Sequence, residues 1–292
     1  MAHVDGEIAS QPGCWRRAAE LADALGPALP QRGERVAATG CGTSWFMAMA
    51  YAGLREHGGH GTTDAFPASE FPAHRGYDRV LAFTRSGTTT EVLDVLTGVP
   101  PSVRTTVVTA DPGSPAAASA EDVVPLPFAD ERSVVQTRFA TTALALLRAH
   151  LGTDLTTAIA DAEVAVHAPL PVDPATLTQV TFLGRGWTVG LAYEAALKCR
   201  EAAQFWTEAY PAMDYRHGPI AIAEHSRAVW VLGEVPHGIE SDVAATGATF
   251  VHSRLDPLAE LVLTQRLAVA LAAHRHLDPD SPRHLTRSVV LT

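Results

Sequence analysis

Lysine is almost absent from this chain. Of its 22 basic side chains only Lys198 is a lysine, and all the others are arginines. A genome that favours arginine codons explains this pattern as well as a local need for a compact ammonium at position 198 does. Positive charge is scarce overall, because 32 acidic side chains give a formal net charge of −10. This balance argues against a general binder of nucleic acid or membrane surfaces, although a local site can still hold a small anion.

Cysteine is also scarce. Cys14, Cys41 and Cys199 are widely spaced and form no CxxC pair, so neither a disulfide framework nor a zinc knuckle is predicted. A reduced cytoplasm is the expected compartment, and no metal or cofactor is expected. The HRH run at 274–276 is interpreted as a solvated helix end. No apolar run approaches the roughly 18 residues of a membrane span, and the first residues lack the apolar core of a signal peptide.

What the chain does contain is apolar sequence, 47% of its 292 residues, arranged as strands that alternate with helices. This alternation predicts an α/β chain with parallel sheets. Strands are expected at 35–39, 79–83, within 104–115, and at 121–128, 179–183, 227–235 and 247–255. Helices are expected at 13–25, 44–56, 89–97, 133–152, 188–206 and 257–276. The 121–128 strand contains prolines and is expected at a sheet edge. A proline-rich stretch at 166–176 suggests a linker between domains 1–165 and 166–292.

Two hydroxyl-rich turns follow successive strands of the first half: GCGTS at 40–44 and TRSGTTT at 84–90. Ligands of open parallel sheets bind beyond the carboxyl ends of the strands, and helix N-termini there favour anions. Helix capping by Ser and Thr explains a single such turn equally well, but two in succession favour a phosphate site. Neither turn is a P-loop, and Trp45 stands where a dinucleotide fingerprint needs its third glycine.

Three motifs resemble the sugar isomerase (SIS) family: GCGTSW, TRSGTTTE and LGRGWTVGLAYEAALKCREAAQFWTEAYPAMDYRHGPIAI. The chain is most similar to the isomerase half of glutamine–fructose-6-phosphate aminotransferase and to stand-alone phosphosugar isomerases and deaminases. The resemblance extends from about residue 7 to residue 290. It implies two tandem SIS subdomains, each a doubly wound five-stranded parallel sheet flanked by helices. The GRGWT turn at 184–188 occupies in the second half the place of GCGTS in the first.

The resemblance also assigns residues. It implies that Glu201 is the proton-transferring base, that Lys198 assists it, and that His217 opens the sugar ring from the neighbouring subunit of a homodimer. Phosphate-binding positions carried over from the family are Ser44, Thr84, Arg85, Ser86 and Thr89. Positions implied to contact the sugar are Gly42, Thr43, Val134, Gln136 and Arg287. The implied ligand is a sugar phosphate, with no nucleic acid and no membrane as partner.

The chemistry explains why these residue types suit the reaction. Interconversion of an aldose or amino sugar with a ketose moves a proton between C1 and C2, which one carboxylate can do as general base and then general acid. Lys198 and Glu201 are three residues apart on a predicted helix and share a face. Their spacing alone equally fits a surface ion pair, and only the surrounding motif favours catalysis.

Two departures from the family narrow the function. The aminotransferases carry a preceding glutaminase domain with a terminal cysteine nucleophile, whereas position 2 here is alanine, so glutamine-driven amination by this chain alone is not expected. Arg287 stands where the family tail has a lysine, and a guanidinium does not form an imine with a sugar carbonyl. Three hypotheses remain: an isomerase or deaminase of hexosamine 6-phosphates, a deglycase of fructosamine-type phosphates, and a sugar-phosphate sensor without catalysis.

Overall fold

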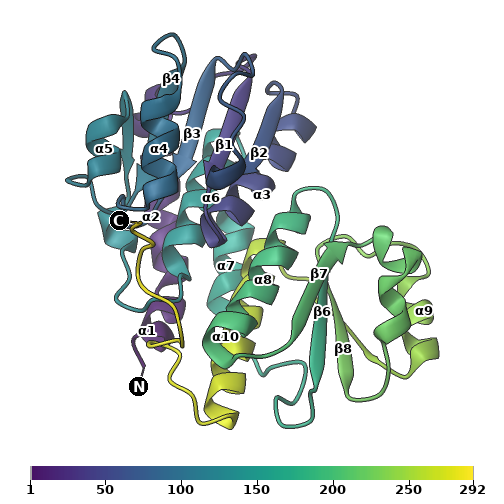
Figure 1. Cartoon of the computed structure of the whole chain (residues 1–292). Coiled ribbons are helices and arrows are strands. Elements are labelled where there is room, and N and C mark those ends of the chain that lie inside the picture. Colours follow the sequence, from purple (N-terminus) through teal and green to yellow (C-terminus); the bar gives the residue numbers. More distant parts are fainter. Residues whose placement is uncertain (1, 292) are drawn as a thin grey trace. The chain divides into compact units, whose positions relative to one another are not determined.

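A computed structural model describes residues 2–291, which form two compact units (Figure 1). Unit 1 comprises residues 1–12, 132–135 and 156–285, and unit 2 comprises 13–131, 136–155 and 286–292. A single division at 165/166 would assign the first helix, the 156–165 segment and the C-terminal tail to the other unit. The two continuous domains expected from the sequence, 1–165 and 166–292, stay a prediction.

Unit 2 contains a five-stranded parallel sheet in the order β2-β1-β3-β4-β5. Its strands are β1 (Val36–Gly40), β2 (Thr63–Pro67), β3 (Arg79–Phe83), β4 (Arg104–Thr109) and β5 (Asp122–Pro125). Its helices are α2 (Gln11–Leu25), α3 (Thr43–His57), α4 (Thr90–Gly98), α5 (Pro115–Ser119) and α6 (Arg138–His150). Every residue of β1 and β3 is buried, as expected where helices cover both faces of a parallel sheet. The proline-containing β5 lies at the sheet edge, as predicted.

Unit 1 contains a four-stranded parallel sheet in the order β7-β6-β8-β9. Its strands are β6 (Gln179–Gly184), β7 (Thr207–Pro211), β8 (Arg227–Leu232) and β9 (Thr249–His252). Its helices are α1 (His3–Ala9), α7 (Thr156–Ala165), α8 (Thr188–Ala203), α9 (Ile239–Thr246) and α10 (Pro257–His274). Helix α10 packs against α8, α7 and α1 (Figure 1).

The expectation of five strands in the second sheet is wrong, because that sheet has four among residues 2–291. After β9 the chain enters α10 at once, where Pro257 takes the first helical position and the Asp256 side chain accepts the Leu258 N–H. A further parallel strand would need a crossover and a β-rich segment after α10. The residues that follow contain Pro279 and Pro282, and the valines at 289–290 belong to unit 2.

The two sheets share an internal repeat. Strand β2 reads TDAFP and β7 reads TEAYP, and each pairs in the same register with the first strand of its unit. Gly40 pairs with Pro67 in one sheet and Gly184 pairs with Pro211 in the other. Both glycines are required by the following helix, because a Cβ would lie 2.6 Å from Ser44 Cβ at residue 40 and 2.2 Å from Thr188 O at residue 184. The halves are therefore two versions of one strand–turn–helix–strand arrangement.

Two absences hold for the part of the chain that is described. None of the helices within residues 2–291 combines the length and hydropathy that crossing a bilayer requires. No group of three or more His, Cys, Asp or Glu side chains in that range is placed to hold a metal ion.

Candidate active site

The TRSGTTT turn of unit 2 connects β3 to α4 and is closed by its own hydroxyls. Thr84 Oγ1 accepts the Gly87 N–H at 3.2 Å, and Ser86 Oγ accepts both the N–H and the Oγ1–H of Thr88, at 3.3 and 3.0 Å. Gly87 has φ +66, and a Cβ there would lie 1.9 Å from Ser114 Oγ. A bulkier residue cannot take this position, so the turn needs its single glycine.

Helix capping does not account for the hydroxyls of the two turns. The residues before α3 and α4 are Gly42 and Thr89, and neither makes a side-chain hydrogen bond to its helix. The sequence elsewhere does supply working caps: Ser114 and Asp256 accept backbone N–H groups at the starts of α5 and α10. The N-termini of α3 and α4 are therefore not closed by side-chain caps, and helix N-termini of this kind suit an anion. Thr43 and Ser44, at the start of α3, are both buried.

The C-terminal tail of unit 2 lies on the same turn. Ser288 Oγ accepts from Thr88 Oγ1 at 2.9 Å and lies 3.3 Å from Thr89 Oγ1. The carbonyl of Val289 accepts the Thr90 N–H at 3.2 Å. A cavity of about 440 Å³ opens beside these contacts, lined by Ser86, Thr88, Ala110, Asp111, Pro127, Asp130, Arg287 and Ser288. Arg287 thus faces the predicted phosphate turn, where its guanidinium contacts Asp130 Oδ1 at 2.5 Å and the Glu131 carbonyl.

Arg85 is buried and turned inward. Its Nη1 lies 3.8 Å from Glu131 Oε2, and its Nη2 donates to the Arg287 carbonyl at 3.2 Å. Glu131, which sequence reasoning did not single out, also accepts the Thr137 and Arg138 N–H groups at 2.6 and 2.9 Å, at the start of α6. Arg85 therefore connects the turn, the tail and the start of α6.

The loop expected to contact the sugar is divided between the units. Val134 is half-buried and belongs to unit 1, whereas Gln136 belongs to unit 2. The amide oxygen of Gln136 is buried and has no hydrogen-bond partner among residues 2–291. A buried acceptor without a donor calls for an explanation, and a substrate hydroxyl would supply one.

In unit 1, helix α8 carries a three-membered ionic cluster. Lys198 Nζ donates to Glu201 Oε2 at 2.5 Å and lies 3.4 Å from Glu194 Oε1. The Lys198 and Glu194 side chains are 1% and 0% exposed, while that of Glu201 is 19% exposed. The surface ion pair that spacing alone allowed is therefore not what forms. Glu194 was missed, although its four-residue spacing before Lys198 places it on the same helix face.

Glu201 opens onto a cavity of about 600 Å³ within unit 1. It is lined by Leu197, Arg200, Glu201, Gln204, Phe205, Trp206, Thr207, Arg283, His284 and Leu285. Trp206 is 71% exposed, which is unusual for tryptophan and provides a flat apolar wall. Glu201 is therefore the member of the ionic cluster that a ligand can reach.

His217 stands apart from this cluster. It ends the short helix Asp214–His217, is exposed, and precedes Gly218 at φ +138. Its imidazole makes no hydrogen bond or ion pair with Lys198, Glu201 or any other residue from 2 to 291. That His217 opens the sugar ring in the site of a neighbouring subunit stays a prediction.

The cysteines are poor nucleophiles where they lie. Burial raises the pKa of Cys199 to about 12. Burial and the nearby Glu91 raise that of Cys41 to about 11. Covalent chemistry through either thiolate is therefore disfavoured at neutral pH.

No family model matches the chain. The glutamine–fructose-6-phosphate aminotransferase (isomerizing) of Gloeobacter violaceus is 27% identical over an alignment 352 residues long. The alignment covers 98% of this chain and 58% of that protein. The chain thus spans less than two thirds of that relative's length. Among solved structures, glucosamine-6-phosphate deaminase of Thermotoga maritima superposes with a TM-score of 0.83 at 24% identity, over 99% of this chain and 100% of that one.

Tagatose-6-phosphate ketose/aldose isomerase of Escherichia coli superposes with a TM-score of 0.79 at 19% identity, over 100% of this chain and 96% of that one. At these identities the superpositions establish the fold, while the sequence match and the three motifs carry the relationship. The chain resembles SIS-domain proteins: it is similar in sequence to the isomerising aminotransferases and in fold to the phosphosugar deaminases and isomerases.

Proposed function

We propose that this protein is a phosphosugar isomerase or deaminase that acts on a hexosamine 6-phosphate or the matching ketose 6-phosphate. One observation carries the proposal: Glu201 is hydrogen-bonded to a buried lysine on one side and open to a cavity on the other. A carboxylate held in this way is fixed in orientation yet reachable by a substrate.

The proposed chemistry uses Glu201 as the proton carrier. In the open-chain amino sugar, Glu201 removes the proton from C2 and returns it to C1, which leaves an imine at C2. Water then adds to C2 and ammonia leaves, so that one water is consumed and one ketose phosphate is formed. Without the amine, the same transfer interconverts aldose and ketose.

Lys198 and Glu194 are positioning residues in this scheme. Lys198 contacts Glu201 through Oε2, which leaves Oε1 to face the substrate. Glu194 holds the ammonium from the buried side. The single lysine of the chain thus contacts two carboxylates with one ammonium group: those of Glu194 and Glu201, which are seven residues apart.

The 84–89 turn is the proposed anchor for the phosphate. Backbone N–H groups at a helix N-terminus, together with Ser and Thr hydroxyls, are suitable donors for its oxygens. A phosphate there would take over hydrogen bonds that Thr88 and Thr90 now make to Ser288 and Val289.

The first test is turnover of glucosamine 6-phosphate and galactosamine 6-phosphate, with ammonia and ketose 6-phosphate followed together. We expect equal amounts of both products, and a loss of about 100- to 10,000-fold in kcat for Glu201→Gln. Glu208→Gln is the matched control, because that glutamate lies on β7, outside the Glu201 cavity, and contacts Tyr210. Full activity in Glu201→Gln would exclude this residue as the base. A chain that is stabilised by the sugar phosphates but turns none over would be a sensor.

His217 is proposed to open the ring from a second copy of the chain. Glu201→Gln and His217→Ala variants should each be inactive, and a mixture allowed to exchange subunits should regain about a quarter of the wild-type activity, because half the dimers then carry one intact site. No recovery in exchanged dimers would mean that both residues serve the same subunit's site.

A deglycase is the second candidate, and the lining of the Glu201 cavity favours it. Arg200, Arg283 and Trp206 share that cavity with Glu201. Two guanidinium groups and an indole suit a substrate whose nitrogen carries an amino acid, since Arg binds carboxylates. Release of a free amino acid from a fructosamine 6-phosphate adduct, faster than ammonia release from the simple amino sugars, would select this function.

A further inference from the structure

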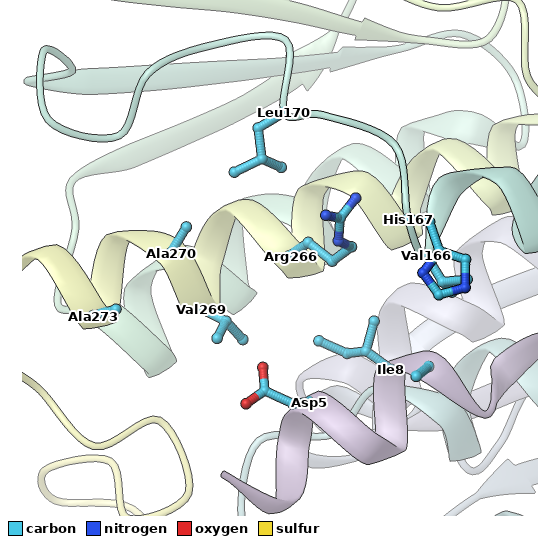
Figure 2. A pocket seen from close by; sticks show the side chains of 10 residues that line it. Asp5, Ile8, Val166, His167, Leu170, Arg266, Val269, Ala270 and Ala273 are labelled. Atoms are coloured by element: carbon cyan, nitrogen blue, oxygen red, sulfur yellow. The ribbon is translucent and has the colours of Figure 1, made fainter. Parts of the chain in front are cut away.

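A second cavity of unit 1 lies away from Glu201 and shares none of its lining residues. It measures about 580 Å³ and is bounded by α1, by the 166–170 segment after α7, and by one face of α10. Figure 2 shows the row Arg266, Val269, Ala270 and Ala273 along α10, with Asp5 and Ile8 from α1 on one side and His167 and Leu170 on the other. Its size lies within the roughly 300–1,000 Å³ of small-molecule sites, and its lining of aliphatic groups with a few polar ones is typical of them.

Arg266 is the unusual member of this lining. Its Nη1 donates to the carbonyls of Ala165 and Ala168, at 2.7 and 2.5 Å, where α7 ends. The remaining donors, on Nε and Nη2, have no acceptor among residues 2–291, and no carboxylate in that range forms an ion pair with this guanidinium. Burial lowers the pKa of Arg266, so the charged form is incompletely solvated there. The Arg266 guanidinium is thus a half-buried cation without an ion-pair partner, and it lies beside an aliphatic surface. Such a site suits a ligand that has both a negative charge and an apolar part.

We propose that this cavity binds a small aliphatic carboxylate, with the carboxylate on the free donors of Arg266 and the hydrocarbon along Ile8, Leu170 and Val269. Arg binds carboxylates through paired N–H donors, and His167 lies beside it as a further donor. Asp5 lines the α1 side, where its Oδ2 accepts the Ala2 N–H at 3.2 Å, and its negative charge opposes an anion at that end. The ligand therefore has one orientation, with its charged end at Arg266.

The test uses three six-carbon probes that differ only in charge: hexanoate, hexanol and hexylammonium. Binding to the whole chain is measured by calorimetry, and backbone amide shifts locate the site. We expect saturable binding of hexanoate, at least tenfold tighter than that of the other two, with shifts in α1, in 166–170 and on α10. Equal or tighter binding of hexylammonium, shifts elsewhere, or no saturable binding of hexanoate would overturn the proposal.

Two variants separate the cation from the fold. Arg266→Gln should weaken hexanoate binding at least tenfold, but it also removes the contacts to the end of α7. Ala270→Glu leaves Arg266 in place and puts a carboxylate into the cavity, so it should abolish hexanoate binding in a folded chain. Arg254→Gln removes an exposed arginine of the same unit outside the cavity and serves as the charge-matched control. Unchanged hexanoate binding in Ala270→Glu would refute the site whatever Arg266→Gln does.

Discussion

Glu260 carries the sharpest prediction about stability. It lies on α10 with 0% exposure, and its Oε1 accepts the indole N–H of Trp230 at 2.8 Å and the Ser253 N–H at 3.0 Å. Its Oε2 is 3.4 Å from the Gly233 N–H. Burial raises the pKa of Glu260 to about 7, against the lowering effect of these hydrogen bonds. A single carboxyl thus joins α10 to β8 and to the turn after β9.

The sign of the pH effect follows from the raised pKa. A carboxyl that titrates higher in the folded than in the unfolded chain contributes stability that is complete below about pH 4.5 and is lost as the pH rises through about 7. With 1.36 kcal/mol per pKa unit, Glu260 costs the folded chain roughly 0.8 kcal/mol at pH 5 and roughly 3.3 kcal/mol at pH 8. The difference between the two pH values is about 2.5 kcal/mol.

Glu260→Gln removes this titration and keeps an oxygen for Trp230 and Ser253. Its amide NH2 faces the Gly233 N–H, which adds a pH-independent cost of about 1 kcal/mol. Urea unfolding at pH 5 and pH 8 should therefore show the variant gaining about 2.5 kcal/mol on the wild type between the two. Glu240→Gln, at an exposed glutamate of α9, is the control and should show no such gain. A gain below about 0.5 kcal/mol, or a gain toward low pH, would refute the reasoning.

Two further predictions concern the site. Lys198→Met leaves the carboxylate of Glu194 buried without the lysine ammonium, so urea unfolding at pH 7 should show a free energy of unfolding lower by about 3–5 kcal/mol. A decrease of less than about 1 kcal/mol would mean that other groups already compensate this ion pair. Gly87→Ala puts a Cβ 1.9 Å from Ser114 Oγ at φ +66 and should cost at least about 2 kcal/mol, whereas Gly98→Ala, whose Cβ would meet nothing within 4 Å, should be close to neutral. Equal effects of the two alanines would contradict the geometry of the turn.

The sequence predicted all the strands at the centres of the sheets and one edge strand of each sheet, β5 and β9. β1, β3, β6 and β8 are runs of apolar and β-branched residues, because helices cover both their faces. β2 and β7 were missed for a shared reason. Each lies at a sheet edge, ends in proline and is only partly buried, so pairing with a neighbour defines it more than composition does.

In the candidate site, too, the sequence predicts contacts between neighbours on one helix but not contacts between residues far apart in the chain. Lys198 and Glu201 are neighbours on one helix, so the helical repeat alone is enough to bring them together. Glu131 meets Arg85, and Ser288 meets Thr88, across 46 and 200 residues of chain. No periodicity links such partners, and only the folded sheet and tail bring them together. The prediction of a fifth strand in the second sheet was wrong because it came from the family resemblance and not from residues capable of forming a strand.

The interleaving of the units sets an order of assembly during synthesis. Helix α1 is made long before its partners: Glu7 accepts the Ser133 N–H, and Asp280 accepts the N–H groups of His3 and Val4. With 277 residues between His3 and Asp280 and a translation rate of about 5–20 residues per second, α1 waits roughly 14–55 s for that contact. Unit 2 likewise lacks its tail until residues 286–291 have left the ribosome. Neither unit can therefore make all of its contacts before then.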